Sequence, residues 1–447
     1  MKVQLSDHFT YKKLLRFVLP SVVMMVFTSI YGVVDGLFVS NFAGKTAFAA
    51  INLVMPFVMV LGGIGFMIGA GGTALVSKIL GEGDRERANR CFSMMVLLTL
   101  ILGVLLSVVG VLFMRPVARF LGATDGMMDD CVLYGRIVTG FTVTFMLQNV
   151  FQSFLIAAEK PHLGLAATVA AGVTNMALDA LFVAGFGWGV AGAAVATGLS
   201  QCVGGLFPLI YFLRPNSSLL RLVKTGLDGR VLLKACANGS SELMNNISSS
   251  VVGMIYNFQL LRYIGEDGVS AYGVLMYVQF IFVAIDIGYA IGCAPVIGYH
   301  YGAGHPSELK NMLRKSSLLM GGTGIVMAVA AAALARPLAL LFVGYDPTLC
   351  ALTQHAFRLF SFAFLLAGFN IFVSSFFTAL NNGEVSAAVS FLRTLVFQTA
   401  SVLLLPELIG VDGIWWAITV AEVFAFVISL LFLFVKRKQY HYMDTKV

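Results

Sequence analysis

Two aspartates lie inside stretches of the chain that are otherwise apolar. Asp35 stands in a hydrophobic run from Phe17 to Phe42, and Asp179 ends the motif Asn175-Met-Ala-Leu-Asp179 inside another such run. A carboxylate in hydrocarbon costs several kcal/mol and is tolerated where it faces a protein interior or a water-filled cavity. We therefore interpret both residues as parts of an ion or proton site.

Neutral oxygen ligands accompany the two acids. Asn175 and Asp179 are spaced i, i+4 and share one helix face, and the same half of the chain holds Asn149 and Thr197 in apolar stretches. Oxygen ligands of this kind suit Na⁺, which the set would hold at Asp35, Asn175 and Asp179, and two adjacent carboxylates can also share a proton. For Asn149 and Thr197, hydrogen bonding between helices is the alternative interpretation.

The second half of the chain has a different polar set. At an offset of 221 residues, Ala400 and Val396 occupy the positions of Asp179 and Asn175. The polar residues in its apolar stretches are Glu242, Asn245, Asn246, Gln279, Asp286, Arg393 and Glu422. Because an unpaired cation in hydrocarbon is costly, we predict that Arg393 lies within ion-pair reach of Glu242 or Asp286, directly or through water. Whichever of these acids remains unpaired would attract a cationic substrate.

The elements that position these residues are transmembrane helices. Of the 447 residues, 59% are hydrophobic and 11% are charged, with a mean hydropathy of +0.89, whereas a soluble domain carries about 25% charged residues. A helix needs about 20 apolar residues to cross a bilayer. The stretches long enough lie near 17–41, 47–77, 91–114, 131–158, 162–186, 188–213, 235–261, 269–301, 316–335, 349–380, 384–406 and 413–435. Residues 93–114 do not alternate as barrel strands do, so we predict an all-α membrane protein with twelve transmembrane helices.

The distribution of basic residues predicts the orientation of the chain. If both termini and the even-numbered loops are inside, 21 Lys and Arg are inside, 5 are outside and 3 fall within the spans. This bias follows the positive-inside rule and places both termini in the cytoplasm. The net charge of +7 is therefore explained by topology, and no nucleic-acid partner is expected. The polar N-terminus has no signal-peptide pattern.

The two halves of the chain resemble each other. Arg115-Pro116 matches Arg336-Pro337, and Gly81-Glu-Gly-Asp84 matches Gly302-Ala-Gly-His305, both at an offset of 221. Six helices followed by six related helices are typical of secondary transporters built from parallel repeats. We predict an N-lobe over 1–213, a cytoplasmic linker over 214–234 and a C-lobe over 235–447, with the lobes related by pseudo-two-fold symmetry.

Motifs for several other functions are missing from the sequence. The six cysteines form no CxxC, which argues against a metal site or disulfide framework. Gly44-Lys45-Thr46 lacks the first glycine of a P-loop, since Val39 stands there, and there is no HExxH. We expect neither an enzyme nor a cofactor, so transport would be driven by a gradient of Na⁺ or H⁺.

The chain resembles the multidrug and toxic compound extrusion (MATE) family over nearly its whole length. The resemblance rests on Val33-Val34-Asp35, on Asn175 with Asp179, on the Gly-x-Gly loops after the second and eighth predicted helices and on Leu392-Arg393-Thr394. Within the family it is similar to the DinF/MepA-type prokaryotic branch.

The resemblance implies efflux of organic cations or drugs from a prokaryotic cell, in exchange for H⁺ or Na⁺, by a monomer in the cytoplasmic membrane whose other partners are lipids. It also implies two lobes arranged as a V that open to alternate sides. The implied cation site comprises Asp35, Asn149, Asn175, Asp179 and Thr197, with Tyr134 at its border. Glu242 matches the helix 7 glutamate of the NorM-type branch, whereas the tenth predicted helix lacks that branch's acid.

Some relatives of this fold move lipid-linked glycans, so a flippase for such lipids is the alternative function. Such flippases usually carry a basic cavity, whereas only three basic residues of this chain lie within spans, namely Arg136, Arg358 and Arg393. This small number argues against an anionic lipid as substrate.

Overall fold

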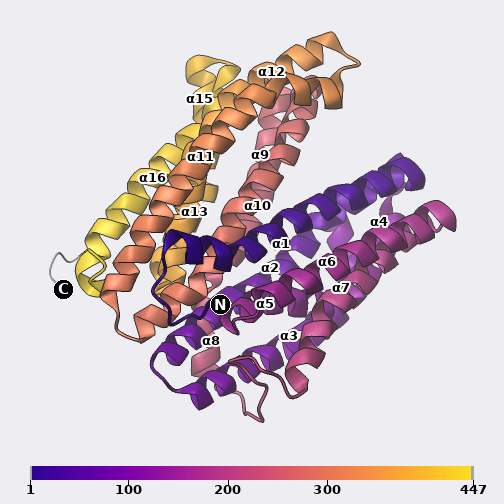
Figure 1. The fold of residues 1–447 in the computed structure, drawn as a ribbon. Helices are drawn as coiled ribbons and strands as arrows, with labels where there is room; N and C mark the ends of the chain where they lie inside the picture. Colours follow the sequence, from indigo (N-terminus) through magenta and orange to yellow (C-terminus); the bar gives the residue numbers. More distant parts are fainter. Residues whose placement is uncertain (1–2, 444–447) are drawn as a thin grey trace.

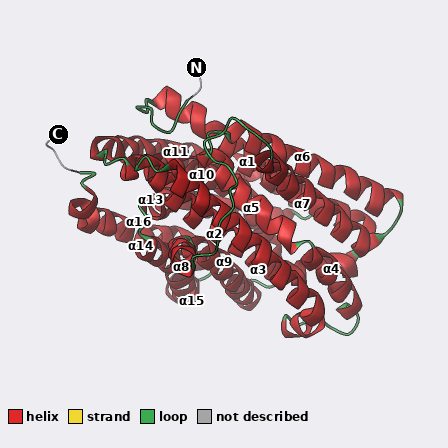
Figure 2. Ribbon diagram, turned by 90° about the horizontal axis from the view of Figure 1, so that it is seen from below, coloured by secondary structure: helices red, strands yellow, loops and turns green. Residues whose placement is uncertain are grey.

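The computed structural model describes residues 3–443, which consist of helices and their connections and contain no strand (Figures 1 and 2). Positions 1–2 and 444–447, the outer ends of the two predicted lobes, lie outside the described residues. The first half contains α1 (Tyr11–Phe38), η1 (Val39–Ala43), α2 (Lys45–Gly81), α3 (Arg85–Phe120), α4 (Met128–Gly140), α5 (Thr142–Ala157), α6 (Pro161–Asp179), η2 (Ala180–Gly185) and α7 (Gly189–Leu213). The second half contains α8 (Gly229–Asn238), α9 (Ser240–Tyr263), α10 (Glu266–Gly302), α11 (Pro306–Val343), α12 (Pro347–Phe360), η3 (Ser361–Ala363), α13 (Phe364–Ala379), α14 (Gly383–Phe391), η4 (Leu392–Phe397), α15 (Gln398–Ile409) and α16 (Asp412–Tyr440).

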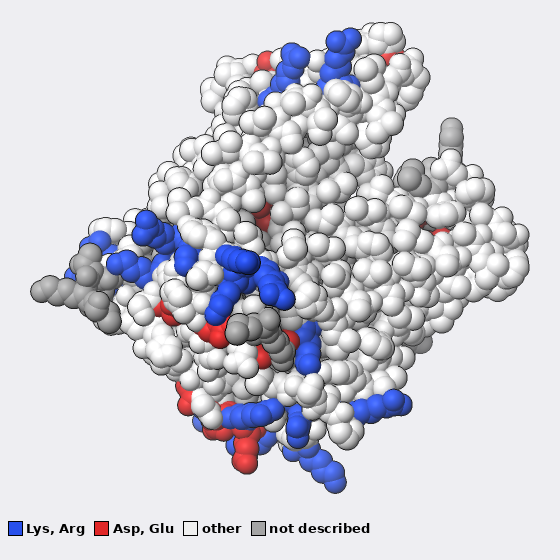
Figure 3. All heavy atoms as spheres, viewed as in Figure 1, with Lys and Arg blue, Asp and Glu red and all other residues white. Residues whose placement is uncertain are grey.

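The helices of the two halves form two bundles that diverge. In Figure 1 the first-half bundle, coloured indigo to magenta, and the second-half bundle, coloured rose to yellow, meet near the two chain termini and separate toward the opposite end. We call the end that carries both termini the basic end. The space-filling view shows most of the visible Lys and Arg side chains there, and the outline of the molecule recedes between the two diverging ends (Figure 3).

The helices are long and apolar enough to cross a membrane. Among residues 3–443, ten helical segments satisfy both conditions by length and composition, and an eleventh span is formed by α4 and α5, which are bent by 54° at their junction. The predicted all-α membrane fold is therefore confirmed. The predicted span 235–261 corresponds to α8 and α9, where the Ser- and Asn-rich sequence of α9 is too polar to pass on hydropathy. Length and hydropathy thus identify up to eleven spans among the described residues, and the twelfth transmembrane helix stays a prediction.

Polar side chains fix several helix starts. The Thr10 hydroxyl accepts a hydrogen bond from the Lys13 backbone N–H at the start of α1, and Asp84 Oδ1 accepts from Arg87 N–H at the start of α3. Asp346 does the same for Leu349 in α12. Such caps satisfy backbone N–H groups that have no partner within the helix, so each helix begins at a residue that the sequence specifies.

Close glycine contacts join the bundles at the basic end. A methyl group placed on Gly81 of α2 would lie 2.0 Å from the Tyr299 carbonyl oxygen, and one on Gly302 of α10 would lie 1.9 Å from that of Lys78. Only glycine allows two helix backbones to approach this closely. Gly81 and Gly302 are matched at the offset of 221, so equivalent positions of the two halves meet at this crossing.

The N-terminal segment also bridges the two halves at the basic end. The backbone N–H of Leu5 donates to Glu159 Oε1 at 2.9 Å, and the Phe9 carbonyl accepts hydrogen bonds from Lys315 Nζ at 2.6 Å and Asn311 Nδ2 at 3.0 Å. Leu5 and Phe9 are fully buried. Because Glu159 follows α5 and Lys315 belongs to α11, the segment links the first-half and second-half bundles.

Candidate functional site

Asp35 and Asp179 both lie at irregular turns of their helices. Asp35 is in the last turns of α1, directly before the π-helical η1, and Asp179 is the last residue of α6, directly before the π-helical η2. Single π-helical turns inserted in α-helices occur often at functional sites. The two breaks contact each other, which brings the two aspartates to the same depth of the bundle.

Gly172 allows α1 and α6 to approach closely beside these acids. A methyl group on Gly172 would lie 2.4 Å from the Phe27 ring and 2.7 Å from the Tyr31 ring. Phe27, Tyr31 and Asp35 are spaced by four residues along one face of α1. Gly172, Asn175 and Asp179 are spaced i, i+3 and i+7 along one face of α6. The close approach therefore sets the acid of one helix against the acid of the other.

We expect Gly172→Ala to weaken the site. The added methyl group must displace the two aromatic rings of α1, and such overpacking typically costs about 1–3 kcal/mol. Gly164→Ala is the matched control on the same helix, because its methyl group would meet Leu155 at an ordinary 3.6 Å. Thermal unfolding and drug transport by both variants would measure the effect. Equal behaviour of the two variants would contradict the proposed role of Gly172.

The carboxyl groups of Asp35 and Asp179 are neighbours with unused hydrogen-bonding capacity. They lie within range of each other's charge, and Tyr134 of α4 lies within range of both. Asp179 is fully buried, and neither of its oxygens has a well-formed hydrogen bond among the described residues; the same is true of Asp35 Oδ1 and Asn175 Oδ1. We call Asp35, Asn175, Asp179 and Tyr134 the N-site. Its buried oxygens without partners can hold a proton or an alkali cation.

Tyr31 extends the N-site toward α5. It lies one turn before Asp35, within range of the Asp35 charge, and its hydroxyl lies near the side chain of Gln148. Gln148 is 5% exposed and packs against Gly204 of α7, where a methyl group would lie 2.7 Å from its amide carbon. The sequence analysis missed both residues. Tyr31 could have been found from the sequence, because it lies four residues before Asp35 and so shares its helix face.

Asn149 and Thr197, the other predicted members, are placed differently. The Asn149 side-chain amide donates to the Gly62 carbonyl oxygen of α2 at 3.1 Å. Thr197 lies half-buried on α7, where its carbonyl accepts a hydrogen bond from the Ser200 hydroxyl. Among residues 3–443, no hydrogen bond links the side chain of either residue to Asp35 or Asp179. The Asn149 contact is of the helix-joining kind considered as the alternative.

A second polar cluster lies in the second-half bundle. Arg393, in η4, forms an ion pair with Glu422 of α16: Nη2 is 2.8 Å from Oε1, and Nε donates to both carboxylate oxygens at 2.9 and 3.0 Å. Asn370 of α13 donates to Glu422 Oε2 at 2.7 Å, and Ser429 donates to Asn370 Oδ1. Among residues 3–443 the direct ion pair of Arg393 is therefore with Glu422 and not with Glu242 or Asp286, because α16 presents Glu422 to the guanidinium group.

Asp286 lies beside this ion pair. It is 1% exposed on α10 and lies within range of the charges of Arg393 and Glu422. We call Asp286, Arg393 and Glu422 the C-cluster. Glu242, half-buried in the first turn of α9, and Gln279, whose Oε1 is buried without a partner in the part of the chain that the structure describes, are not joined to it by a hydrogen bond.

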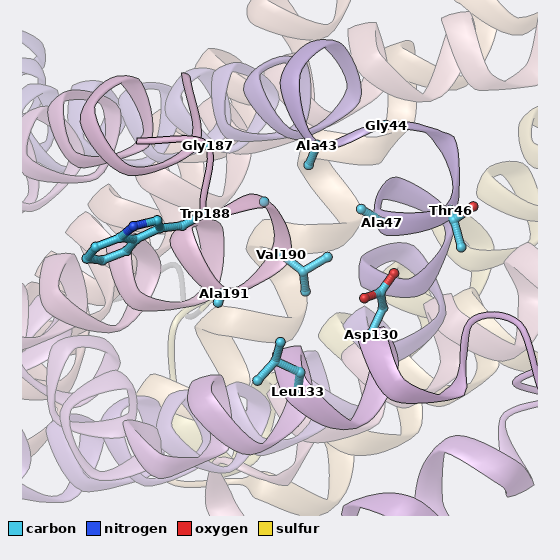
Figure 4. A pocket seen from close by; sticks show the side chains of 11 residues that line it. Ala43, Gly44, Thr46, Ala47, Asp130, Leu133, Gly187, Trp188, Val190 and Ala191 are labelled. Atoms are coloured by element: carbon cyan, nitrogen blue, oxygen red, sulfur yellow. The ribbon is translucent and has the colours of Figure 1, made fainter. Parts of the chain in front are cut away.

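A shallow pocket opens at the end of the first-half bundle away from the termini. Its volume is about 360 Å³, and it is bordered by the η1–α2 junction, the start of α4 and the η2–α7 junction (Figure 4). Asp130 is the ionisable side chain among the described residues of its lining, and the Trp188 ring points away from the other labelled side chains. The N-site residues do not line it. Among residues 3–443, no group of three or more His, Cys, Asp or Glu is arranged to hold a metal ion.

Comparison with known proteins identifies the family of the chain. The MatE family model matches residues 20–181 and again residues 243–402, one segment in each half. The chain belongs to the MatE family. The two matched segments together cover most of the sequence, and they include Asp35 and Asp179 in the first and Asp286 and Arg393 in the second.

Relatives of this MatE protein match it over nearly its full length. It is 24% identical over 429 residues to the multidrug export protein MepA of Staphylococcus saprophyticus, covering 96% of this chain and 94% of that protein. A solved structure described as the outward-facing conformation of a multidrug resistance MATE family transporter matches with a TM-score of 0.92 at 22% identity, covering 98% of both chains. A crystal structure of MATE in complex with MaL6 also matches with a TM-score of 0.92, at 21% identity, covering 97% of this chain and 98% of that one. The family and the fold predicted from the sequence are thereby confirmed.

Proposed function

We propose that this MatE protein is a secondary active transporter that exports organic cations or drugs in exchange for H⁺ or Na⁺, and that the N-site binds the coupling cation. The observation that carries the proposal is the adjacent pair of half-buried Asp35 and fully buried Asp179, in which Asp35 Oδ1 and both Asp179 oxygens have no well-formed hydrogen bond in the described chain. A buried carboxylate pair needs a neutralising cation. The names of the multidrug-export relatives support drugs as the class of substrate.

The coupling cation must distinguish the two conformations of the transporter. A ligand that binds both conformations equally shifts neither. The N-site suits this role because α1, which carries Asp35, contacts α6 on one side and α10 of the second-half bundle on the other. A change in charge at Asp35 therefore acts on a helix that lies between the two bundles.

We further propose that the protein is a monomer in a prokaryotic cytoplasmic membrane with both termini in the cytoplasm. Both termini lie at the basic end, where Lys and Arg gather (Figures 1 and 3), as the positive-inside rule requires of a cytoplasmic face. In this orientation the diverging ends of the two bundles face outward, and the glycine crossing at Gly81 and Gly302 closes the cytoplasmic side.

Transport in proteoliposomes with imposed gradients tests the function and identifies the ion. Full-length protein would be reconstituted, and ethidium movement would be followed under a Na⁺ gradient or a pH gradient. One of the two gradients should drive ethidium against its concentration. Transport under neither gradient would contradict the proposal.

Asn175→Ala separates the two coupling ions. A shared proton needs only the two acids, whereas Na⁺ needs the additional amide oxygen. Mutation even of an outer-shell partner of a metal ligand typically costs about 10- to 100-fold in affinity or activity, so we expect at least that loss from removing a direct ligand under Na⁺ coupling and a much smaller one under H⁺ coupling. Thr174→Ala, which changes the neighbouring half-buried residue whose hydroxyl donates to the Ala170 carbonyl of its own helix, is the matched control and should transport normally.

A further inference from the structure

The C-cluster has an uneven charge balance. It contains two carboxylates, Asp286 and Glu422, and one guanidinium group, Arg393. Arg393 and Asp286 lie in apolar spans of the chain, and the side chains of Arg393 and Glu422 are only 12% and 3% exposed. With every group ionised, the cluster carries one net negative charge, which has a high cost in a buried, membrane-embedded position.

Arg393 is already committed to one of the two acids. Its Nε and Nη2 both bind the Glu422 carboxylate, in the fork-like arrangement that gives the strongest ion pairs. Asn370 supplies a further hydrogen bond to Glu422 and is itself held by Ser429. The Glu422 carboxylate is therefore neutralised and hydrogen-bonded, and Asp286 carries the negative charge that remains uncompensated.

Asp286 lacks the partners that a buried carboxylate needs. Its Oδ1 is buried without a hydrogen-bond partner among residues 3–443, and Arg393 and Glu422 are the charged groups that act on it. Oδ1 points at the backbone of α13, where a methyl group on Gly368 would lie only 2.6 Å away. Glycine thus leaves room for the carboxyl group at this place while offering it no hydrogen bond.

We propose that Asp286 is a second cation site, which binds one monovalent cation, H⁺ or Na⁺, and so neutralises the C-cluster. The site goes beyond the proposed function, because it lies in the other half of the chain and shares no residue with the N-site. A protein with both sites holds two cations, one in each bundle, and its coupling stoichiometry can differ from one cation per drug.

Variants that change the charge of the C-cluster test the site. The number of bound cations should equal its net negative charge. Asp286→Asn removes the surplus acid and Glu422→Gln frees Arg393 for Asp286, so each should lose one cation. The double variant Arg393→Gln with Glu422→Gln leaves Asp286 as the sole charge and should keep one cation, as the wild type does.

Two measurements on full-length protein in nanodiscs distinguish the two ions. Infrared spectroscopy reports a protonated carboxyl group through its C=O stretch, and radioactive sodium reports bound Na⁺. If the cation is H⁺, one C=O band should be absent from both single variants and present in the double variant. If the cation is Na⁺, one bound sodium per protein should follow the same pattern.

The pattern separates this site from the N-site and from a structural role. Asp179→Asn, which alters the N-site, should leave the C-cluster signal unchanged, so failure of one site does not imply failure of the other. Asp286→Asn and Glu422→Gln change residues on different helices. A purely structural effect would not make both single variants lose one cation while the double variant keeps the wild-type number. Unchanged cation counts in both single variants, or loss of the cation in the double variant, would overturn the proposal.

Discussion

Asp179→Asn is expected to abolish drug efflux driven by the ion gradient while leaving the protein folded in the membrane. The amide keeps the shape of the fully buried carboxyl group but can neither take up a proton nor carry the charge that attracts a cation. Without a cation that favours one conformation, the gradient can no longer bias the transport cycle. Mutation even of an outer-shell partner of a metal ligand typically costs about 10- to 100-fold, so the loss here should be at least that large, and Asp35→Asn should behave similarly.

Ethidium efflux from vesicles with imposed gradients would measure this loss, and size-exclusion chromatography of the detergent-solubilised protein would show that each variant folds. Asp130→Asn is the matched control, because Asp130 is in the same bundle but lines the surface pocket instead of the N-site. It should pump at the wild-type rate. Wild-type pumping by Asp179→Asn under either gradient would show that the coupling cation binds elsewhere.

The neighbouring positions of Asp35 and Asp179 could be predicted because the cost of burial constrains them. Two acids in apolar helices of the same half both need a polar environment, and a single shared cavity supplies it to both of them. Helix periodicity placed Asn175, one turn before Asp179, on the same helix face and therefore in the same predicted site. Sequence could not show that Asn149 turns toward Gly62, because an amide in a membrane helix binds either an ion or a neighbouring backbone, and the rotation of α5 decides which.

The partner of Arg393 could not be predicted for the same kind of reason. Glu242, Asp286 and Glu422 all satisfy the need for a negative charge, and charge alone does not rank them. The structure selects Glu422 because α16 packs against η4. The internal repeat pointed to the environment of Glu422. Asn370 matches Asn149 at the offset of 221, and both donate their side-chain amides to backbone carbonyls of a neighbouring helix, in the case of Asn370 that of Glu422.

The span that contains α9 shows a limit of hydropathy as a guide. The helix Ser240–Tyr263 is long enough to cross a bilayer but carries Glu242, Asn245 and Asn246 in its first turns. Its first turns face α2 of the other bundle, since a methyl group on Gly63 would lie 3.3 Å from Asn246 Cβ. A helix that faces protein needs less apolar surface than one that faces lipid, so its polarity reflects its position between the bundles.

Arg393→Gln is expected to destabilise the protein more than any other single change at the C-cluster. It leaves Glu422 and Asp286 as two buried acids with no basic residue between them. Removing one partner of a buried ion pair typically costs about 3–5 kcal/mol. The double variant with Glu422→Gln removes both charges of the pair and should recover most of that loss, because neutral amides can still hydrogen-bond to each other and to Asn370.

Thermal unfolding in detergent would measure both variants against an exposed ion pair. Arg115 lies 3.8 Å from Asp129, with side chains 59% and 94% exposed, so Arg115→Gln should cost only about 0–1 kcal/mol. The expected order of stability is wild type, closely followed by Arg115→Gln, then the double variant, then Arg393→Gln. If Arg393→Gln unfolds at the wild-type temperature, Arg393 does not hold the buried carboxylates together. If the double variant is less stable than the single one, the loss comes from the packing of the arginine side chain and not from the unpaired charges.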